Sequence, residues 1–300
     1  MATRNEWHRC KAIIIIGRGG WLLNSYCIDS LAAVGREVRA DIVRMTAAAG
    51  SGHPGGSLSA VELLTALYFK VMRHRPTEPK WPERDRFILS KGHACPLLYS
   101  VMARSGYLPA EELTTLRKFG SCLQGHPSCL ALPALEVSSG SLGQGLSIAN
   151  GLALTAKMNG QGFRVYCLMG DGELQEGQVW EAVMSAAHYK LDNVCALVDY
   201  NGLQIDGDVE NVMGLAPLAE KWRAFNWHAV EIDGHDYEQV LAAYDEAART
   251  KDRPTVIIAI TVKGKGVSFM ENAAGWHGKA PNVDELKRAL DDIYGKGLGQ

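Results

Sequence analysis

Apolar residues recur at intervals of three and four along the first part of the chain. Between Ile28 and Ala49 they are Leu31, Val34, Val38, Ile42 and Met45. This spacing is typical of an amphipathic helix, and Gly50 is suited to end it. A loop over residues 51–57 and a second helix over about 59–72 are expected to follow.

Short apolar runs farther along the chain alternate with helical patterns. The runs cover Phe87–Ser90, Val165–Met169, Val194–Val198, Trp227–Ile232 and Thr255–Thr261. Helices are predicted near residues 96–104, 109–119, 145–158 and 178–190, and a last helix is predicted to end near 294. Strands that alternate with helices predict an α/β fold, a doubly wound parallel sheet flanked by helices. We expect one domain over residues 26–300 and a poorly ordered extension over residues 1–25.

The composition limits the classes of function. The chain has 300 residues, 47% of them apolar, and a formal net charge of −2, which gives no indication of nucleic-acid binding. No apolar run approaches the roughly 20 residues that span a bilayer, so no membrane association is expected. Seven cysteines without a Cys-x-x-Cys pair are typical of reduced thiols, which predicts a cytoplasmic protein.

The strongest chemical signal is Gly170-Asp171-Gly172, with Asn201 thirty residues after Asp171. Each polar residue follows a predicted strand, and a predicted helix joins the two strands. In a parallel unit of this kind both residues emerge at the carboxyl edge of the sheet, where ligands bind. A carboxylate and an amide oxygen beside glycines suit a Mg²⁺ or Ca²⁺ ion that holds a diphosphate. A helix cap or a turn would explain either residue alone, but not the pairing.

Four short motifs extend this signal. They are Ser51–Ser57 (SGHPGGS), Ser90–Ala94 (SKGHA), Gly125–Pro127 (GHP) and Gly170–Gly177 (GDGELQEG). Together and in this order they resemble the transketolase family of thiamine diphosphate enzymes. The resemblance runs from about residue 28 to the end of the chain, but it matches only the first half of an ordinary transketolase. It implies the diphosphate-binding (PP-type) domain of the thiamine-diphosphate-binding fold.

The resemblance implies a site for thiamine diphosphate and for Mg²⁺ or Ca²⁺. It assigns the metal to the carboxylate of Asp171, the amide oxygen of Asn201 and the backbone carbonyl of Leu203. It places cofactor contacts at His93, Gly140, Leu142, Gly172, Asn201, Ile205 and His277. Most relatives have proline where this chain has Ser141, and an ordinary core position explains Ile205 nearly as well.

Histidines that follow glycine form a second group of candidates. His53, His93 and His126 lie in glycine-flanked loops, and histidine exchanges protons near neutral pH. The resemblance implies that they and His277 are catalytic residues that contact the sugar substrate or the cofactor. It also places Glu176 among the catalytic residues, in a buried glutamate network between subunits, whereas an exposed helix start is the plainer explanation.

The other histidines match none of the motifs and are expected to be structural. They are His8, His74, His188, His228 and His235. Lys263 and Lys265 lie in a glycine-containing turn. They could attract a sugar phosphate, but lysines in such a turn are usually solvated.

The function predicted from the resemblance is that of the N-terminal subunit of a split transketolase. No part of residues 1–300 resembles the family's pyrimidine-binding domain, which carries the glutamate that activates the aminopyrimidine ring of the cofactor. We therefore expect the partner to be a C-terminal transketolase subunit, the substrates to be sugar phosphates, and the assembly to be a heterotetramer with two subunits of each kind. The reaction would transfer a two-carbon ketol unit from a ketose phosphate to an aldose phosphate.

Three alternatives stay open at this point. The same fold could act on another sugar, as a deoxyxylulose phosphate synthase or as a transketolase for a catabolic ketose. The chain could instead be the α subunit of a 2-oxo acid dehydrogenase, although His126 and His277 favour a sugar substrate. A non-catalytic subunit that binds only the cofactor is the third alternative, and cofactor titration in the presence of the partner would test it.

Overall fold

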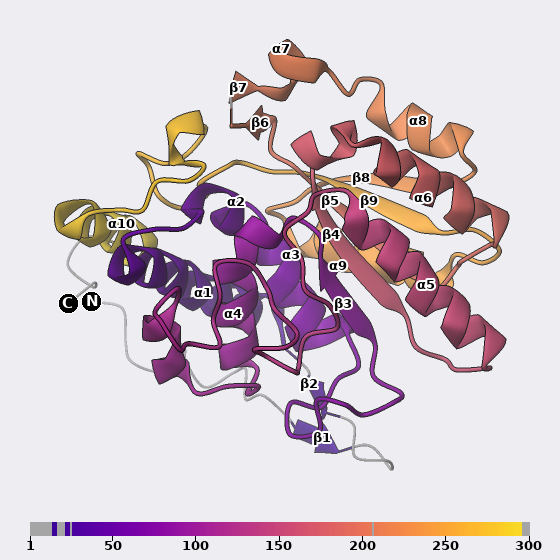
Figure 1. Cartoon of the computed structure of the whole chain (residues 1–300), viewed down its shortest axis with the longest axis horizontal. Helices are drawn as coiled ribbons and strands as arrows, with labels where there is room; N and C mark the ends of the chain where they lie inside the picture. Colours follow the sequence, from indigo (N-terminus) through magenta and orange to yellow (C-terminus); the bar gives the residue numbers. More distant parts are fainter. Residues whose placement is uncertain (1–13, 17–21, 25, 206, 296–300) are drawn as a thin grey trace.

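The structure, a computed structural model, describes residues 14–16, 22–24, 26–205 and 207–295 (Figure 1). Its centre is a five-stranded sheet with the strand order β3-β4-β5-β9-β8. The strands are β3 (Arg86–Leu89), β4 (Val165–Gly170), β5 (Val194–Tyr200), β8 (His228–Asp233) and β9 (Thr255–Ile260). All neighbouring strands in this sheet are parallel. The predicted α/β class with a parallel sheet is confirmed.

Helices cover both faces of this sheet (Figure 1). The core on the first side of the sheet includes residues of α1 (Ile28–Ala49), α3 (Val61–Ala66), α4 (Cys95–Arg104), α9 (Tyr237–Arg249) and α10 (Val283–Tyr294), and α10 packs against α1. The second face packs against α5 (Gln144–Met158), α6 (Gly177–His188) and α8 (Leu218–Ala224). Because successive side chains of a strand point to opposite faces, Tyr166 and Leu168 belong to the first core, and Val165 and Cys167 to the second. A strand buried on both faces therefore appears as a continuous apolar run.

The first predicted helix has the expected bounds. It ends at Gly50, whose φ of 61° is left-handed and whose N–H donates to the carbonyl of Ala47 at 3.1 Å. The prediction of a loop over residues 51–57 is partly wrong, because Pro54 begins a short helix, α2 (Pro54–Leu58). The chain then bends at Ser59, whose hydroxyl donates to the buried carboxylate of Asp199 at 2.5 Å.

The prediction of a single helix over residues 59–72 is also wrong. The segment divides into α3 and a π-helical turn, Leu67–Val71. In addition, 3₁₀ turns cover Gly92–Ala94, Ala110–Thr115, Gly172–Gln175 and Ala274–Trp276. The structure adds α8, α9 and α7 (Val209–Met213), and a small antiparallel pair, β6 (Leu203–Gln204) and β7 (Gly207–Asp208), to the predicted elements.

The extension predicted over residues 1–25 lies mostly outside the described residues. Within it, β1 (Ile14–Ile16) and β2 (Leu22–Asn24) form an antiparallel pair. Cys95, Cys122, Cys129, Cys167 and Cys195 are free thiols. In the part of the chain that the structure describes, no helix combines the length and the apolar character needed to cross a membrane.

Candidate active site

The loops after β4 and β5 bring the first two predicted ligands together. Gly170 at the end of β4 lies opposite Asp199 of β5 in the parallel register, so the residues that follow emerge side by side. The carboxylate of Asp171 accepts hydrogen bonds from the backbone N–H groups of Gly172 at 2.8 Å and Gly202 at 2.6 Å. The carboxylate thus ties the loop after β4 to the loop that contains Asn201.

These loops line a cavity of about 390 Å³. All the residues predicted for the site contribute to its wall: His53, His93, His126, Gly140, Leu142, Asp171, Gly172, Glu176, Asn201, Leu203, Ile205 and His277. The residues not predicted there are Gly56, Lys91, Gly170, Glu173, Gln175, Gln204 and Lys263. Segments from across the sequence therefore converge on one cavity at the carboxyl edge of the sheet.

Asp171 carries a buried negative charge that is poorly compensated. Asp171 is only 3% exposed. Burial, together with the charge of nearby Asp199, raises the pKa of Asp171 to about 6. A cation beside this carboxylate would favour its ionised form.

The available donors suit a hard cation. Among the described residues, no group of three or more histidine, cysteine, aspartate or glutamate side chains is placed to hold a metal. Such an ion would therefore need amide, carbonyl or external oxygens besides Asp171, which is the mixed oxygen set typical of Mg²⁺ and Ca²⁺. Asn201 and Leu203 line the cavity next to Asp171 and offer such oxygens.

Lys263 is not the solvated residue expected from the sequence. It is 2% exposed, lines the cavity, and donates from Nζ to the carbonyl oxygen of Leu203 at 2.8 Å. Burial, with a contribution from the charge of Lys91, lowers the pKa of Lys263 to about 8. The same signal that found Asp171 could have found it, because Lys263 follows β9, which lies next to β5 in the sheet.

An ion pair that the sequence did not predict joins Lys91, which lines the cavity, to Asp199, which does not. The two residues are 1% and 0% exposed, and the ammonium donates both to the Asp199 carboxylate and to the carbonyl of Gly56 at 2.9 Å. Burial alone would raise the pKa of Asp199, but Lys91 and hydrogen bonds from Ser59 and Thr261 outweigh it and lower the pKa.

Asp199 also orients a predicted metal ligand. The side-chain amide of Asn201 donates to Asp199 at 3.1 Å, while its oxygen accepts from the N–H of Leu203 at 3.2 Å. The amide plane of Asn201 is therefore held at both ends. This role depends on a contact that no local sequence pattern shows.

Four histidines form a cluster on the cavity wall. Ring centroids lie 5.2 Å apart for His53 and His93, 5.4 Å for His53 and His277, and 5.2 Å for His93 and His277. His126 lies 6.4 Å from His53. The buried Nδ1 atoms of His53 and His277 have no hydrogen-bond partner among the described residues. Buried polar atoms are usually satisfied, so these two atoms are exceptions within the cluster.

The surroundings keep the four imidazoles neutral at pH 7. Burial, followed by the charge of Arg117, lowers the pKa of His53 to about 4. Burial and the charge of Lys263 lower the pKa of His277 to about 3. Burial also lowers the pKa of His93, and that of His126 to a smaller extent. A neutral imidazole both donates and accepts a hydrogen bond, which suits contact with hydroxyl groups.

We expect this neutrality to be measurable as a dependence of stability on pH. Because the pKa values of His53 and His277 are lowered in the folded chain, the unfolded chain binds protons first as the pH falls below 6.5. The contribution of these two histidines to the free energy of unfolding should therefore decrease between pH 6.5 and about 4. The wild type should thus lose more stability over this range than the variant His53→Gln/His277→Gln. Histidine NMR of the wild-type chain checks the cause, and a titration of His53 near pH 6.5 would contradict it.

The remaining predicted residues lie at the cavity rim. Gly140 has a φ of 150°, and a Cβ there would lie 3.5 Å from the ring of His126. Ile205 is 71% exposed, which excludes the ordinary core position considered above. Glu176 is exposed and precedes α6 without a capping hydrogen bond from its side chain. The exposed glutamate of this single chain is not part of a buried network within it.

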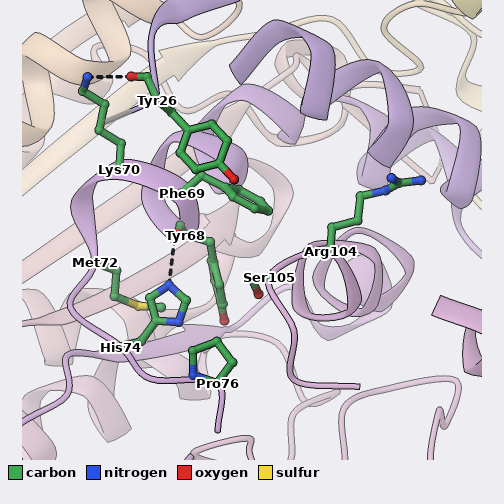
Figure 2. A pocket seen from close by; sticks show the side chains of 9 residues that line it. All are labelled: Tyr26, Tyr68, Phe69, Lys70, Met72, His74, Pro76, Arg104 and Ser105. Carbon is green, nitrogen blue, oxygen red and sulfur yellow. Dashed lines mark hydrogen bonds between the residues drawn. The ribbon is translucent and has the colours of Figure 1, made fainter. Parts of the chain in front are cut away.

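His74, one of the histidines without a motif, lies in a different and smaller cavity of about 90 Å³ (Figure 2). Its Nε2 pairs with the carbonyl of Tyr68 at 2.7 Å, and its Nδ1 pairs with the hydroxyl of Tyr107 at 3.0 Å. Both ring nitrogens are thus engaged, unlike Nδ1 of His53 and His277.

Comparison with known proteins identifies similar chains. The family model described as "Transketolase, thiamine diphosphate binding domain" matches residues 29–296. The chain is 41% identical to one subunit of the apulose-4-phosphate transketolase of Phocaeicola vulgatus, over 89% of this chain and 94% of that one. It is 44% identical to 6-deoxy-6-sulfo-D-fructose transketolase subunit SqwG of Clostridium sp., over 83% and 90%.

Among solved structures, transketolase from Campylobacter jejuni superimposes with a TM-score of 0.85 at 34% identity. The match covers 89% of this chain and 43% of the solved one. The chain therefore spans nearly all of the two similar subunits but less than half of the solved transketolase.

Proposed function

This chain belongs to the transketolase family, where it corresponds to the thiamine diphosphate-binding domain, and we propose that it is the cofactor-binding subunit of a two-chain transketolase. The proposed reaction moves a two-carbon ketol unit from a ketose phosphate to an aldose phosphate. The observation that carries the proposal is that Asp171, Asn201 and the four histidines line one and the same cavity.

The cavity fits thiamine diphosphate with a divalent cation. Asp171, Asn201 and the carbonyl of Leu203 would hold the cation. The Lys263 ammonium, which donates to that carbonyl in this structure, would then turn toward the negative diphosphate. Gly172 lines the cavity, and a side chain there would crowd Gln204, because a Cβ would lie only 3.2 Å from the Cβ of Gln204. When bound, the cofactor supplies the nucleophilic carbon and the electron sink for cleavage and formation of the carbon–carbon bond.

The histidines supply the polar contacts that this chemistry needs from the protein. The imidazoles of His53 and His277 line the cavity, where a neutral ring can donate a hydrogen bond to a sugar hydroxyl or accept one from it. Neutral imidazoles accept a proton from one hydroxyl and return it to another without the cost of burying a lasting charge. His93 and His126 complete the wall, where His93 would contact the cofactor and His126 would orient the substrate.

The partner is proposed to be a C-terminal transketolase subunit that closes the cavity. Two similar chains of nearly the same length are named as transketolase subunits, which supports a second chain. Ile205 and Glu176 are exposed at the rim, where another chain would cover them. A heterotetramer with two subunits of each kind would give two such sites.

Reconstitution tests the proposed function. We expect the purified chain with thiamine diphosphate and Mg²⁺ to turn over little substrate, and the chain co-expressed with a pyrimidine-binding subunit to be active. The assay follows two-carbon transfer from xylulose 5-phosphate to ribose 5-phosphate. Full activity of the single chain would contradict the two-subunit proposal, and failure of the complex to bind thiamine diphosphate would contradict the cofactor.

The sugar is a separate question, because the two similar subunits are named for apulose 4-phosphate and 6-deoxy-6-sulfofructose. These names support a catabolic ketose as donor beside the common ketose phosphates. A panel that contains xylulose 5-phosphate, apulose 4-phosphate and 6-deoxy-6-sulfofructose would rank the donors by kcat/KM. Oxidation of pyruvate with ferricyanide as acceptor would instead support the 2-oxo acid dehydrogenase alternative, which the family match disfavours.

A further inference from the structure

A buried polar cluster outside the cavity holds the loop that carries Lys263. The cluster consists of Arg39 on α1, Glu62 on α3 and His235 between β8 and α9. At most 14% of any of these three side chains is exposed, and none of them lines the cavity. The sequence motifs gave no function to any member of this cluster.

Hydrogen bonds define the tautomer of His235. Its Nε2 accepts from the backbone N–H of Val262 at 2.9 Å. The proton of the neutral ring must therefore be on Nδ1, which lies 3.0 Å from Oε2 of Glu62 and donates to it. Glu62 also accepts two bonds from Nη2 of Arg39, at 2.7 and 2.9 Å. Although burial raises the pKa of Glu62, Arg39 and His235 outweigh it and lower the pKa, so the carboxylate is ionised.

The cluster holds the loop on both sides of Lys263. The ring of His235 accepts a hydrogen bond from Val262, the residue before Lys263. On the other side, Nε of Arg39 donates to the carbonyl of Lys265 at 3.0 Å. Gly266 has a φ of 90°, and a Cβ there would lie 2.9 Å from Cδ of Arg39. The loop backbone is thus packed closely against the cluster.

We propose that His235 is a positioning residue for the cofactor site and acts through Lys263. By holding the amide of Val262, it sets the backbone from which the Lys263 side chain reaches the carbonyl of Leu203. Loss of the acceptor at Nε2 would free this backbone and move the ammonium away from the diphosphate. The inference rests on the proposed function, in which the Lys263 ammonium faces the cofactor diphosphate.

Two variants of similar size separate this role from general stability. His235→Gln keeps a side-chain oxygen within reach of Val262, whereas His235→Asn is too short to do so but still reaches toward Glu62. Thiamine diphosphate binding with Mg²⁺ is measured by calorimetry on the complex with the partner subunit. We expect about 10-fold weaker binding in His235→Asn and near wild-type binding in His235→Gln, with the KM for the ketose unchanged in both.

A double-mutant cycle with Lys263→Met tests whether His235 affects cofactor binding through Lys263. If His235 acts through Lys263, His235→Asn should weaken binding no further in the Lys263→Met background. His228, which pairs with Glu246 at the surface, provides the control, and His228→Asn should bind the cofactor as the wild type does.

The inference is overturned if both His235 variants bind the cofactor equally well. Effects of His235→Asn and Lys263→Met that simply add would also overturn it, because they would show that His235 does not act through the lysine. A wild-type complex that binds no thiamine diphosphate would overturn the proposed function and this inference together. Wild-type binding with unaffected variants would overturn only the inference.

Discussion

Replacement of Asp171 with asparagine is expected to lower kcat/KM of the complex by on the order of 100-fold or more, with a matching loss of thiamine diphosphate affinity at low Mg²⁺. Among the proposed metal ligands, only Asp171 carries a charge. Because Asp171 is only 3% exposed, water has little access to take the place of its carboxylate oxygen as a ligand. The asparagine retains an oxygen acceptor for Gly172 or Gly202, so the fold should be preserved. Steady-state kinetics and Mg²⁺ titration of cofactor binding measure both effects.

The matched control is Asp208→Asn. Asp208 lies in β7 of the same loop region but is exposed, and it accepts a hydrogen bond from Asn211. Its replacement should change kcat/KM by less than about twofold, because an exposed side chain without a ligand role contributes little. If Asp171→Asn retained the Mg²⁺ dependence of the wild type, the metal assignment would be wrong.

The largest effect on stability is expected for Asp199→Asn, which should reduce the free energy of unfolding by about 3–5 kcal/mol. The variant leaves the ammonium of Lys91, itself 1% exposed, without its anionic partner. It also weakens the acceptor for Ser59, Thr261 and Asn201. Urea unfolding of the purified protein, followed by tryptophan fluorescence, gives the change.

An exposed ion pair provides the comparison. Glu220 pairs with Arg223, and both side chains are largely solvated, so Glu220→Gln should change the free energy of unfolding by less than about 1 kcal/mol. The double variant Lys91→Met/Asp199→Leu removes both buried charges and should recover part of the lost stability, but not cofactor binding, because Asn201 loses the group that orients it. Wild-type stability in Asp199→Asn would refute the proposed importance of the buried pair.

Part of the fold and of the site could be read from the chain itself. The intervals of three and four between Leu31 and Met45 predicted α1, and Gly50 predicted its end. The apolar runs before Asp171 and Asn201 predicted β4 and β5, and the parallel arrangement then placed both residues at one edge. These signals are local, because a periodic pattern or a short motif needs no knowledge of distant contacts.

The errors arose where contacts between distant segments decide the local structure. Pro54–Leu58 forms a helix where a loop was expected, and the chain then turns at Ser59, whose hydroxyl donates to Asp199, 140 residues farther along the chain. Likewise, Ile205 has an apolar side chain of the kind that usually lies in a core, but it is exposed at the rim of the cavity. Propensity is a weak signal that tertiary contacts routinely override.

By itself, the sequence determined the α/β class, the paired residues Asp171 and Asn201, and the histidine motifs that the cavity brings together. Only the tertiary structure decided that Lys263 and Asp199 are buried beside them, and that His235 bonds the loop before Lys263. The physical reason is that the state of a charged or polar side chain depends on its burial and its partners. Both of these are set by residues that the chain brings together from far apart.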